Sequence, residues 1–453
     1  MRKILVITHF LPWPIRQASW HRNMGLLEHL REQGHRVDLL VAPQRPWARS
    51  LVESFPPVVD RVFMNTPTPH DRPGSYFVGH IANAIRATRI PILEAAGRRS
   101  FHIAKRLVNR AKQRIRTVYV SARPIKGQCA VPGFPFTEGQ HAKLRELLAE
   151  EDYDTIIVGN TLVTPLVSDI SREGRQWLVD TNDCFHQRAK SMRENGIEVP
   201  DPVNFTRQQE TGALGKFDVI IAIQKQEAMM FREMLPGKQT ICVGMTSPIE
   251  RLPNRGQHVT IVGAKSPVNA EGAVRVLNET WPRVLRDCPG AVLDIFGGLC
   301  NCDEVREAAS PFAPSSVVLH GEVDDLKQAY HCDVVLAPLW VGSGLKLKVV
   351  EALCHGKPVV TTSVGAQGLD EAIGSAMLVN DRTDMLAEHL ISLLGDEKRR
   401  RSLADAAYAF AMNHFTPERV YGELDQVLSK KPSAFSTKAS QPGNRSQKEA
   451  KVA

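Results

Sequence analysis

The sequence of 453 residues predicts an α/β protein built from two doubly wound domains that face each other across a cleft. Short apolar runs alternate with amphipathic stretches of helical length, a pattern typical of right-handed βαβ units and a mainly parallel sheet. The alternation stops in a segment rich in Pro, Arg and Gly between residues 248 and 256, and then begins afresh. A chain of this length also has enough residues for two hydrophobic cores.

The first domain is assigned to residues 1–240. Its apolar runs have the length and β-branched content of buried strands, and the stretches between them have helical periodicity. The predicted elements, in order, are a strand KILVITHF, a helix from about Trp20 to Gln33, a strand VDLLVA, a strand DTIIVG (154–159), a helix near 162–171, and strands QWLVDTN and DVIIAI.

The second domain is assigned to residues 250–415. Its predicted elements are strands HVTIVG, AVLDIFG, SVVLHG, DVVLAPL and PVVTT, and helices at 270–286, 303–309, 383–394 and 397–414. A last helix follows at 416–429. Residues 430–453 are rich in Ser, Lys, Gln and Pro and have too little apolar surface to fold, so they are expected to form a disordered basic tail.

The composition is that of an ordinary soluble protein, with 43% hydrophobic and 23% charged residues. No apolar run reaches the length of a membrane span, and KILVITHF is too short for a signal peptide. The eight cysteines are scattered, and Cys300 and Cys302 lack the second pair that a zinc site needs. We therefore expect a cytoplasmic protein with reduced thiols.

Positive charge is concentrated in two segments of the chain, whose net charge is +8. Residues 72–137 hold thirteen Lys and Arg residues against the single acid Glu94, and residues 430–453 hold six against Glu449. We assign about 66–140 to a basic helical insertion in the first domain. Its amphipathic part, 86–116, suits an anionic membrane surface, a polyanionic acceptor, or simple packing on the domain. Few aromatic residues and no recognised module argue against nucleic acid.

The most informative stretch is 341–368, which reads as strand end, glycine loop, helix and strand. GSG at 342–344 follows a buried strand and precedes a helix whose apolar face includes Leu345, Val349 and Leu353. A glycine loop that feeds a helix leaves free N–H groups and a positive dipole end, which suit a phosphate.

Charged side chains of this helix extend the same argument. Lys346 and Lys348 lie in the first turn, where cations are unfavourable against the helix dipole unless an anion is bound. Glu351 follows at a distance where its carboxylate can accept from sugar hydroxyls. The spacing suggests a site for a diphosphate with a ribose attached. Solvated lysines and an ordinary helical glutamate remain the alternative, because GSG is not a full phosphate-binding fingerprint.

The wording of this stretch, GSGLKLKVVEALCHGKPVVTTSVGAQGL, closely resembles the nucleotide-sugar site of glycosyltransferase family 4 (glycosyl transferases group 1), which has the GT-B fold of two Rossmann-like domains. PRVLRDCPGAVLDIFGG, VVLHGEVDDL, KFDVIIAIQKQEA and LREQGHRVDLLVA fit the same family in order. The resemblance covers roughly residues 1–60 and 150–430. It implies that the last helix, 416–429, packs back on the first domain.

The resemblance also implies roles for residues of the second domain. Glu351 matches the family's ribose-binding glutamate, whereas Ser343 stands where the family has a first glutamate. Ala264 and Glu271 stand where the family has cations that bind the diphosphate. In this chain that binding is therefore expected from Lys265, Lys346 and Lys348. Strand-end residues are expected to flank the base, although turn chemistry alone explains their glycines equally well. The expected donor-binding residues, beside Lys346 and Glu351, are Gly263, Lys265, Gly297, Gly321, Val323, Gly342, Ser343, Gly344, Leu345 and Lys348.

In the first domain the resemblance points to acceptor-side residues. LVDTNDCFHQR is similar to the family's DTHD segment, with Asn182 where histidine is usual, and Asp183 is expected to orient an acceptor hydroxyl or to cap the strand. Asn160 follows a strand where some relatives have an active-site histidine. Arg22, at the start of the first helix, is expected either to face the cleft or to lie on the surface.

Taken together, these implications predict a metal-independent, retaining glycosyltransferase. It needs no cofactor and moves a sugar from a nucleotide diphosphate sugar to a hydroxyl of a glycan or lipid-linked acceptor. The expected setting is polysaccharide or glycolipid assembly, in the cytoplasm or at the inner face of the membrane. Two alternatives stay open: a catalytically silent protein that binds nucleotide sugars or glycans, and a polyanion-binding protein that uses the basic segment.

Overall fold

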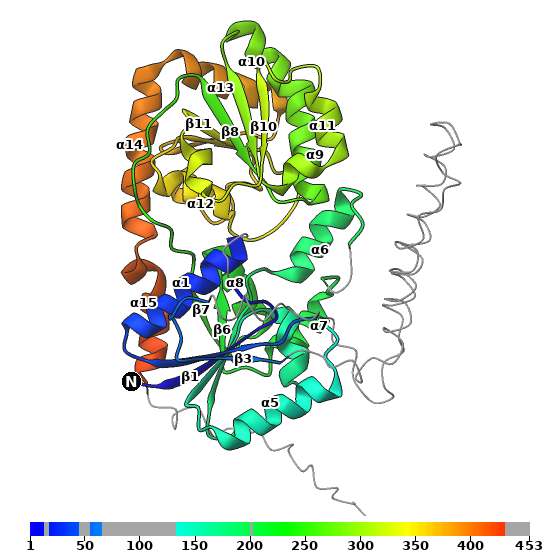
Figure 1. Ribbon diagram of the computed structural model, residues 1–453, viewed down its shortest axis with the longest axis vertical. Coiled ribbons are helices and arrows are strands. Elements are labelled where there is room, and N and C mark those ends of the chain that lie inside the picture. The colour runs from blue at the N-terminus through cyan, green and yellow to red at the C-terminus, as the bar shows by residue number, and fades with distance from the viewer. Residues whose placement is uncertain (13–17, 45–54, 66–132, 200–202, 431–453) are drawn as a thin grey trace, which may run out of the picture.

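The computed structural model describes residues 1–12, 18–44, 55–65, 133–199 and 203–430. They form two α/β domains, each with one wholly parallel sheet, stacked one above the other in Figure 1. The predicted fold class is therefore confirmed. The basic segment 86–116 and the tail 431–453 lie outside the described residues.

The first sheet has seven strands in the order β3-β2-β1-β4-β5-β6-β7. Its strands are β1 (Lys3–Thr8), β2 (Arg36–Val41), β3 (Arg61–Met64), β4 (Thr155–Val158), β5 (Gln176–Asp180), β6 (Val219–Ala222) and β7 (Gln239–Cys242). Its α-helices are α1 (Ala18–Glu32), α5 (Glu138–Glu150), α6 (Phe185–Glu194), α7 (Arg207–Leu214) and α8 (Lys225–Met234).

The second sheet has six strands in the order β10-β9-β8-β11-β12-β13. Its strands are β8 (His258–Val262), β9 (Val292–Phe296), β10 (Val317–Gly321), β11 (Val334–Ala337), β12 (Val359–Thr361) and β13 (Met377–Val379). Its α-helices are α9 (Pro267–Arg275), α10 (Trp281–Asp287), α11 (Asp303–Ala309), α12 (Leu347–Cys354), α13 (Thr383–Gly395) and α14 (Glu397–His414).

Short helical turns complete the two domains. A π-turn, η4 (Val276–Thr280), joins α9 to α10. The helix expected at 270–286 is therefore observed as a continuous helical segment whose pitch changes locally at η4. The 3-10 turns are η3 (Thr161–Val167), η5 (Gly298–Asn301), η6 (Leu326–Tyr330) and η7 (Asp370–Ala372). The helix expected near 162–171 is observed as the shorter 3-10 turn η3. Pro165 lies inside that turn and lacks the N–H that an α-helix would need there.

The last helix, α15 (Pro417–Ser429), packs on the first sheet, although the chain has already completed the second domain. Val420, Tyr421 and Leu424 are buried in one cluster with Ile4 and other apolar residues of that sheet. In Figure 1, α14 and α15 run in succession along one side of the molecule, from the second domain to the first. The last helix thus connects the two domains.

Both strand orders reverse direction once, between β1 and β4 in the first sheet and between β8 and β11 in the second. In doubly wound sheets ligands bind outside the carboxyl ends of the strands at such a switch point. In the second sheet the switch point joins the loop after β8, which starts at Gly263, to the loop after β11, which contains GSG. The topology therefore directs attention to these two loops.

A candidate nucleotide-sugar site between the domains

The glycine loop 342–344 precedes α12 in a conformation that needs glycine. The φ angles of Gly342 and Gly344 are 130° and 77°, which residues other than glycine rarely adopt. Lys346 is the N-cap of α12, so the helix begins at Leu347, slightly later than expected. Within the described part of the chain, the backbone N–H groups of 343–348 donate no hydrogen bond. Unpaired N–H groups at a helix start form a binding site for an anion.

Lys346 points back onto its own loop. Its Nζ donates to the carbonyl oxygens of Ser343 at 2.8 Å and Gly344 at 2.6 Å, and to Oε1 of Gln367 at 3.1 Å. Burial lowers the pKa of Lys346 to about 8, although the nearby carboxylates of Asp183 and Glu227 oppose that shift. A bound phosphate would stabilise this desolvated ammonium, which supports its predicted contact with the diphosphate.

Lys348 lies one residue inside the helix and faces the neighbouring α9. Its Nζ donates to Oδ1 of Asn269 at 3.0 Å. Burial, and then the charge of Lys346, lower the pKa of Lys348 to about 8. Two ammonium groups with lowered pKa values at one helix start, where the dipole also disfavours cations, are expected where an anion binds.

Glu351 is buried in α12, and two residues hold its carboxylate. The hydroxyl of Tyr330 donates to Oε2 at 2.5 Å, and burial followed by this carboxylate raises the pKa of Tyr330. Nδ1 of His21, on α1 of the first domain, lies 3.5 Å from Oε1. One oxygen is thus oriented by a fully buried tyrosine, while the other faces the opposite domain.

The remaining predicted donor residues of the second domain lie at strand ends around this loop. Gly263 directly follows β8, and a Cβ on Gly297 would lie 2.5 Å from the carbonyl oxygen of Gly263, so the two strand ends approach closely. Gly321 ends β10 with a φ of 75°, and Val323 and Leu345 pack on the apolar cluster beneath the loop. The structure therefore brings these residues to one edge of the sheet.

Lys265 is exposed and donates to the carbonyl oxygen of Asn301 at 3.0 Å. It lies beside the start of η5, because a Cβ on Gly298 would be 3.0 Å from its backbone nitrogen. The side chain is thus held at the edge of the site, and its predicted phosphate contact requires that bond to be exchanged.

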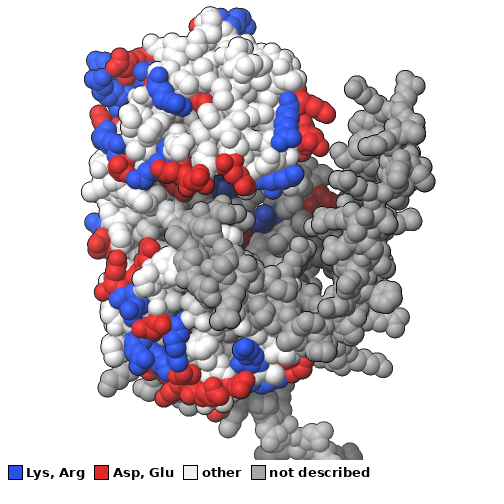
Figure 2. All heavy atoms as spheres, in the orientation of Figure 1, with Lys and Arg blue, Asp and Glu red and all other residues white. Residues whose placement is uncertain are grey.

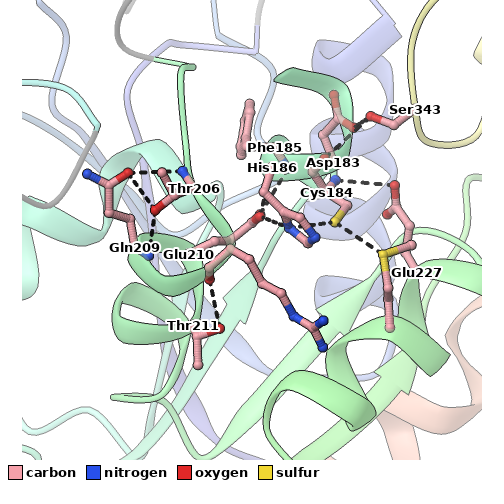
Figure 3. Close-up of polar contacts among 12 residues, drawn as sticks. Asp183, Cys184, Phe185, His186, Thr206, Gln209, Glu210, Thr211, Glu227 and Ser343 are labelled. Carbon is pink, nitrogen blue, oxygen red and sulfur yellow. Dashed lines mark hydrogen bonds and ion pairs between the residues drawn. The ribbon is translucent and has the colours of Figure 1, made fainter. Parts of the chain in front are cut away.

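Asp183 is a first-domain residue that contacts the glycine loop. Its Oδ1 accepts a hydrogen bond from Oγ of Ser343, and its Oδ2 accepts one from Arg188 at 2.9 Å. The backbone N–H of Gly342 also donates to Oγ of Ser191, on α6, at 3.2 Å. Ser343 and Gly342 thus tie the loop to α6, and the structure joins Asp183 to the donor side of the cleft (Figure 3).

Arg22 is buried in the first domain and takes neither of the two expected positions, in the cleft or on the surface. It is 3% exposed, and its guanidinium donates to Oδ2 of Asp180, to Oδ1 of Asn182 at 3.0 Å, and to the carbonyl oxygens of residues 243 and 244. The expectation was wrong because Asp180, at the end of β5, is a buried carboxylate that needs a cation. Asn182 is engaged in the same network and has a φ of 58°.

Asn160 also has a local structural role. Its Oδ1 accepts from the backbone N–H of Leu162 at 2.9 Å and so caps the turn η3. Asparagine is one of the residues preferred at such caps, which explains its presence after β4 without any ligand. An acceptor contact by Asn160 therefore stays a prediction that this geometry does not favour.

Two glutamates that the sequence analysis did not select organise the start of α6 (Figure 3). Glu210, fully buried, accepts from the backbone N–H groups of Phe185 and His186, both at 2.9 Å, and lies 2.7 Å from Nδ1 of His186. Glu227 accepts from the backbone N–H of Cys184 at 3.2 Å. The polar run QKQE directly after the strand DVIIAI was the available signal for Glu227, since side chains at strand ends reach the cleft.

Cys184, His186 and Glu210 are the group that could hold a metal ion among the described residues, since their ligand atoms lie within 4.8 Å of one another. The oxygens of Glu210 are already used by two N–H groups and by the His186 ring. Burial, followed by the charges of Glu210 and Glu227, raises the pKa of Cys184, so the thiol stays protonated. The prediction of a metal-free enzyme remains untested by this geometry.

Known structures share this architecture. The chain matches TarM of S. aureus with a TM-score of 0.65 at 10% identity, over 95% of this chain and 99% of that one. Sucrose-phosphate synthase from Thermosynechococcus elongatus matches with 0.65 at 15% identity, over 96% and 100%. HepE of Anabaena, in complex with UDP and glucose, matches with 0.59 at 15% identity, over 95% and 100%. The protein thus has the GT-B fold.

The second domain also resembles a known family in sequence. Residues 256–396, which include the glycine loop, both lysines and Glu351, match the family model of glycosyl transferases group 1. An uncharacterized 44.6 kDa protein in the cps region of Klebsiella pneumoniae is 21% identical over 303 residues, 64% of this chain and 78% of that protein. The sequence resemblance to group 1 is confirmed, and these matches support a glycosyltransferase. Assignment to family 4 in particular stays a prediction.

Proposed function

We propose that the protein transfers a sugar from a nucleotide diphosphate sugar to an acceptor hydroxyl. The observation that carries this proposal is the start of α12, where a glycine loop at the sheet's switch point presents unpaired N–H groups and two lysines. Such a site holds a diphosphate, and Glu351 lies about one turn further, at the reach of the attached ribose.

In the reaction the bond between C1 of the sugar and the diphosphate oxygen breaks, and the acceptor oxygen bonds to C1 while its proton leaves. Negative charge then grows on the departing diphosphate. Preorganised N–H groups and ammonium groups stabilise such charge most strongly in a site that excludes water. Lys346, Lys348 and the helix start supply this positive charge, and we propose that transfer needs no metal for that reason.

Glu351 is proposed to accept hydrogen bonds from the ribose. A carboxylate held by a buried donor keeps its orientation, and Tyr330 provides that donor at 2.5 Å. In the described structure His21 lies next to the other oxygen of Glu351, so an incoming ribose exchanges with the imidazole. The domain contact therefore changes when the donor binds.

Further contacts close the cleft on the side of α8. Lys225 pairs with Glu371 at 2.9 Å, and Gln226 donates to Asp370 at 2.9 Å. A closed cleft excludes water, which otherwise competes with the acceptor for the sugar. Asp183 lies next to the glycine loop, where the acceptor hydroxyl must approach, which supports its proposed role in orienting that hydroxyl.

The finer parts of the proposal concern the acceptor and the stereochemistry. We propose transfer with retention, as the family resemblance implies, to a glycan or a lipid-linked acceptor in polysaccharide or glycolipid assembly. The relative encoded in a cps region supports a polysaccharide setting, and structures of similar fold hold UDP, with glucose in one and alpha-GlcNAc-glycerol in another.

Among the described helices, none has both the length and the apolar character to cross a membrane. On the face in Figure 2 described acidic and basic side chains are interspersed over both domains.

Nucleotide binding is the first test. One of UDP, GDP, ADP and CMP is expected to raise the melting temperature by several degrees, because a ligand at 100 times its Kd stabilises a protein by about 2.7 kcal/mol. Lys346→Ala and Glu351→Ala are each expected to remove most of that shift, since a charge-assisted hydrogen bond contributes about 1.5–3 kcal/mol. Differential scanning fluorimetry measures all three proteins.

Lys143→Ala is the matched control, because Lys143 is exposed on α5 and lies outside the site. It is expected to keep the full shift. A wild-type protein that responds to none of the four nucleotides would contradict the proposal. Binding without donor cleavage or transfer would favour the catalytically silent alternative.

Nucleotide affinity should also depend on pH above neutrality. In the free protein the pKa values of Lys346 and Lys348 are both about 8, and a bound diphosphate raises them. Both groups are charged below pH 8, whereas above it binding must take up protons, so affinity is expected to fall as pH rises from 8 to 10. Isothermal titration at pH 7 to 10 measures this decline. An affinity that stays constant over this interval would show that neither lysine contacts the anion.

A further inference from the structure

Glu227 is a buried carboxyl group at the contact between the two domains. It lies in the first turn of α8, is 1% exposed, and accepts from the backbone N–H of Cys184 through Oε1. Its second oxygen, Oε2, is buried and has no hydrogen-bond partner among the described residues. A buried acceptor without a donor is costly, and native proteins keep few of them. Glu227 therefore needs an explanation.

The position of Glu227 relates it to the glycine loop. A Cβ placed on Gly344 would lie 3.5 Å from Oε1 of Glu227 and 3.4 Å from Oδ1 of Asp183. The two carboxyl groups thus form the wall that the first domain presents to this loop. Residue 344 has no side chain, which lets the loop approach this wall closely.

Charge decides which part of a nucleotide sugar can lie against this wall. A diphosphate next to the carboxylate of Asp183 would be repelled, whereas the helix start and the two lysines attract it. The sugar is uncharged, carries hydroxyl donors, and is bonded directly to the diphosphate. The side of the glycine loop that faces the first domain therefore suits the sugar.

Asp183 and Glu227 differ in how many further hydrogen bonds their oxygens can accept. Asp183 already accepts from Ser343 and Arg188, one on each oxygen. Oε2 of Glu227 has no donor. Burial, and then the charge of Asp183, raise the pKa of Glu227 to about 8, which shows how poorly its surroundings compensate a charge there.

We propose that Glu227 is a specificity-determining residue that binds a hydroxyl of the donor sugar through Oε2. The second domain then holds the nucleoside diphosphate, and the first domain recognises the sugar. This assignment rests on the proposed function and extends it to the sugar. A site built to hydrogen-bond a hydroxyl discriminates strongly against ligands that lack it.

The test compares two ligands on one variant. Glu227→Gln keeps the shape and a carbonyl oxygen for Cys184, but replaces the acceptor Oε2 by an amide. Titrations use UDP, GDP and ADP, and then UDP-glucose, GDP-mannose and ADP-glucose, with the wild type, the variant and Glu233→Gln. Glu233 is the matched control, since it is an exposed glutamate of the same helix.

The expected result separates sugar recognition from a structural role. Glu227→Gln should leave the Kd of the free diphosphate within about twofold and weaken the matching nucleotide sugar tenfold or more, while Glu233→Gln changes neither. The melting temperature of the Glu227→Gln protein without ligand should stay equal or rise, because the amide is neutral and no charge has to be buried beside Asp183.

Three results would overturn the assignment. Equal weakening of diphosphate and nucleotide sugar would give Glu227 a structural role, and so would a lower melting temperature with unchanged affinities. An unchanged affinity for the nucleotide sugar at unchanged stability would remove Glu227 from the site. If the wild type binds none of the six compounds, the proposed function itself fails, and the assignment fails with it.

Discussion

Replacing Lys346 by alanine is expected to slow sugar transfer by about 10²–10³-fold, the usual loss when one preorganised donor to a developing negative charge is removed. The ammonium lies at the N-cap of α12, next to the N–H groups that are proposed to receive the diphosphate. Its effect belongs to the transition state, where the leaving group gains charge, so kcat should fall more than the donor affinity. Donor cleavage by an excess of enzyme in a single turnover measures this step.

Protein stability should not fall in the same variant. The pKa of Lys346 is lowered to about 8, so folding at neutral pH has to bury a charged group, and the alanine variant avoids that cost. Lys143→Ala should keep the wild-type rate. If Lys346→Ala cleaved the donor at a rate close to wild type, the positive charge would have to come from elsewhere, and Lys346 would only shape the loop through its carbonyl contacts.

The fold could be predicted from the sequence because each strand and helix is indicated by a short continuous run of residues. Runs such as DVVLAPL and PVVTT are buried strands whatever surrounds them, and β11 and β12 lie inside those runs. The donor loop was predictable for the same reason. Residues 342–351 form one continuous strand-end, loop and helix start, so Lys346 and Glu351 lie close together because they are only five residues apart across the start of α12.

The first-domain wall of the site could not be predicted in this way. Glu227 and Asp183 are distant in sequence and meet only because β5 and β6 are neighbours in the sheet. Their contact with Gly344 further depends on how the two domains pack, which no local pattern encodes. Tyr330 is a similar case, since a tyrosine after a short turn gives no sign that its hydroxyl holds Glu351.

Arg22 illustrates the opposite error, in which a charged residue was expected in the cleft. Its position after a strand-end loop is typical of ligand-binding residues, and sequence alone gives no measure of burial. The partner, Asp180, looks like an ordinary strand residue in QWLVDTN. The two become an ion pair only when α1 packs against the end of β5.

Replacing Arg22 by methionine is therefore expected to destabilise the first domain by about 3–5 kcal/mol, the usual effect of leaving a buried charge without its partner. Asp180 is fully buried, and its Oδ1 has no hydrogen-bond partner among the described residues. Hydrogen exchange of β5 and β6, followed by mass spectrometry, measures the loss locally. This readout suits a two-domain protein, in which a single unfolding transition is not assured.

A second substitution distinguishes a structural Arg22 from one that binds the acceptor. Asp180→Asn, added to Arg22→Met, removes the uncompensated charge and should restore part of the lost protection. Nucleotide binding by the second domain should persist in both proteins, because the glycine loop and Glu351 lie outside this network. If Arg22→Met kept full protection but lost transfer to the acceptor, the guanidinium would have to leave Asp180 during the reaction, and Arg22 would return to the acceptor side.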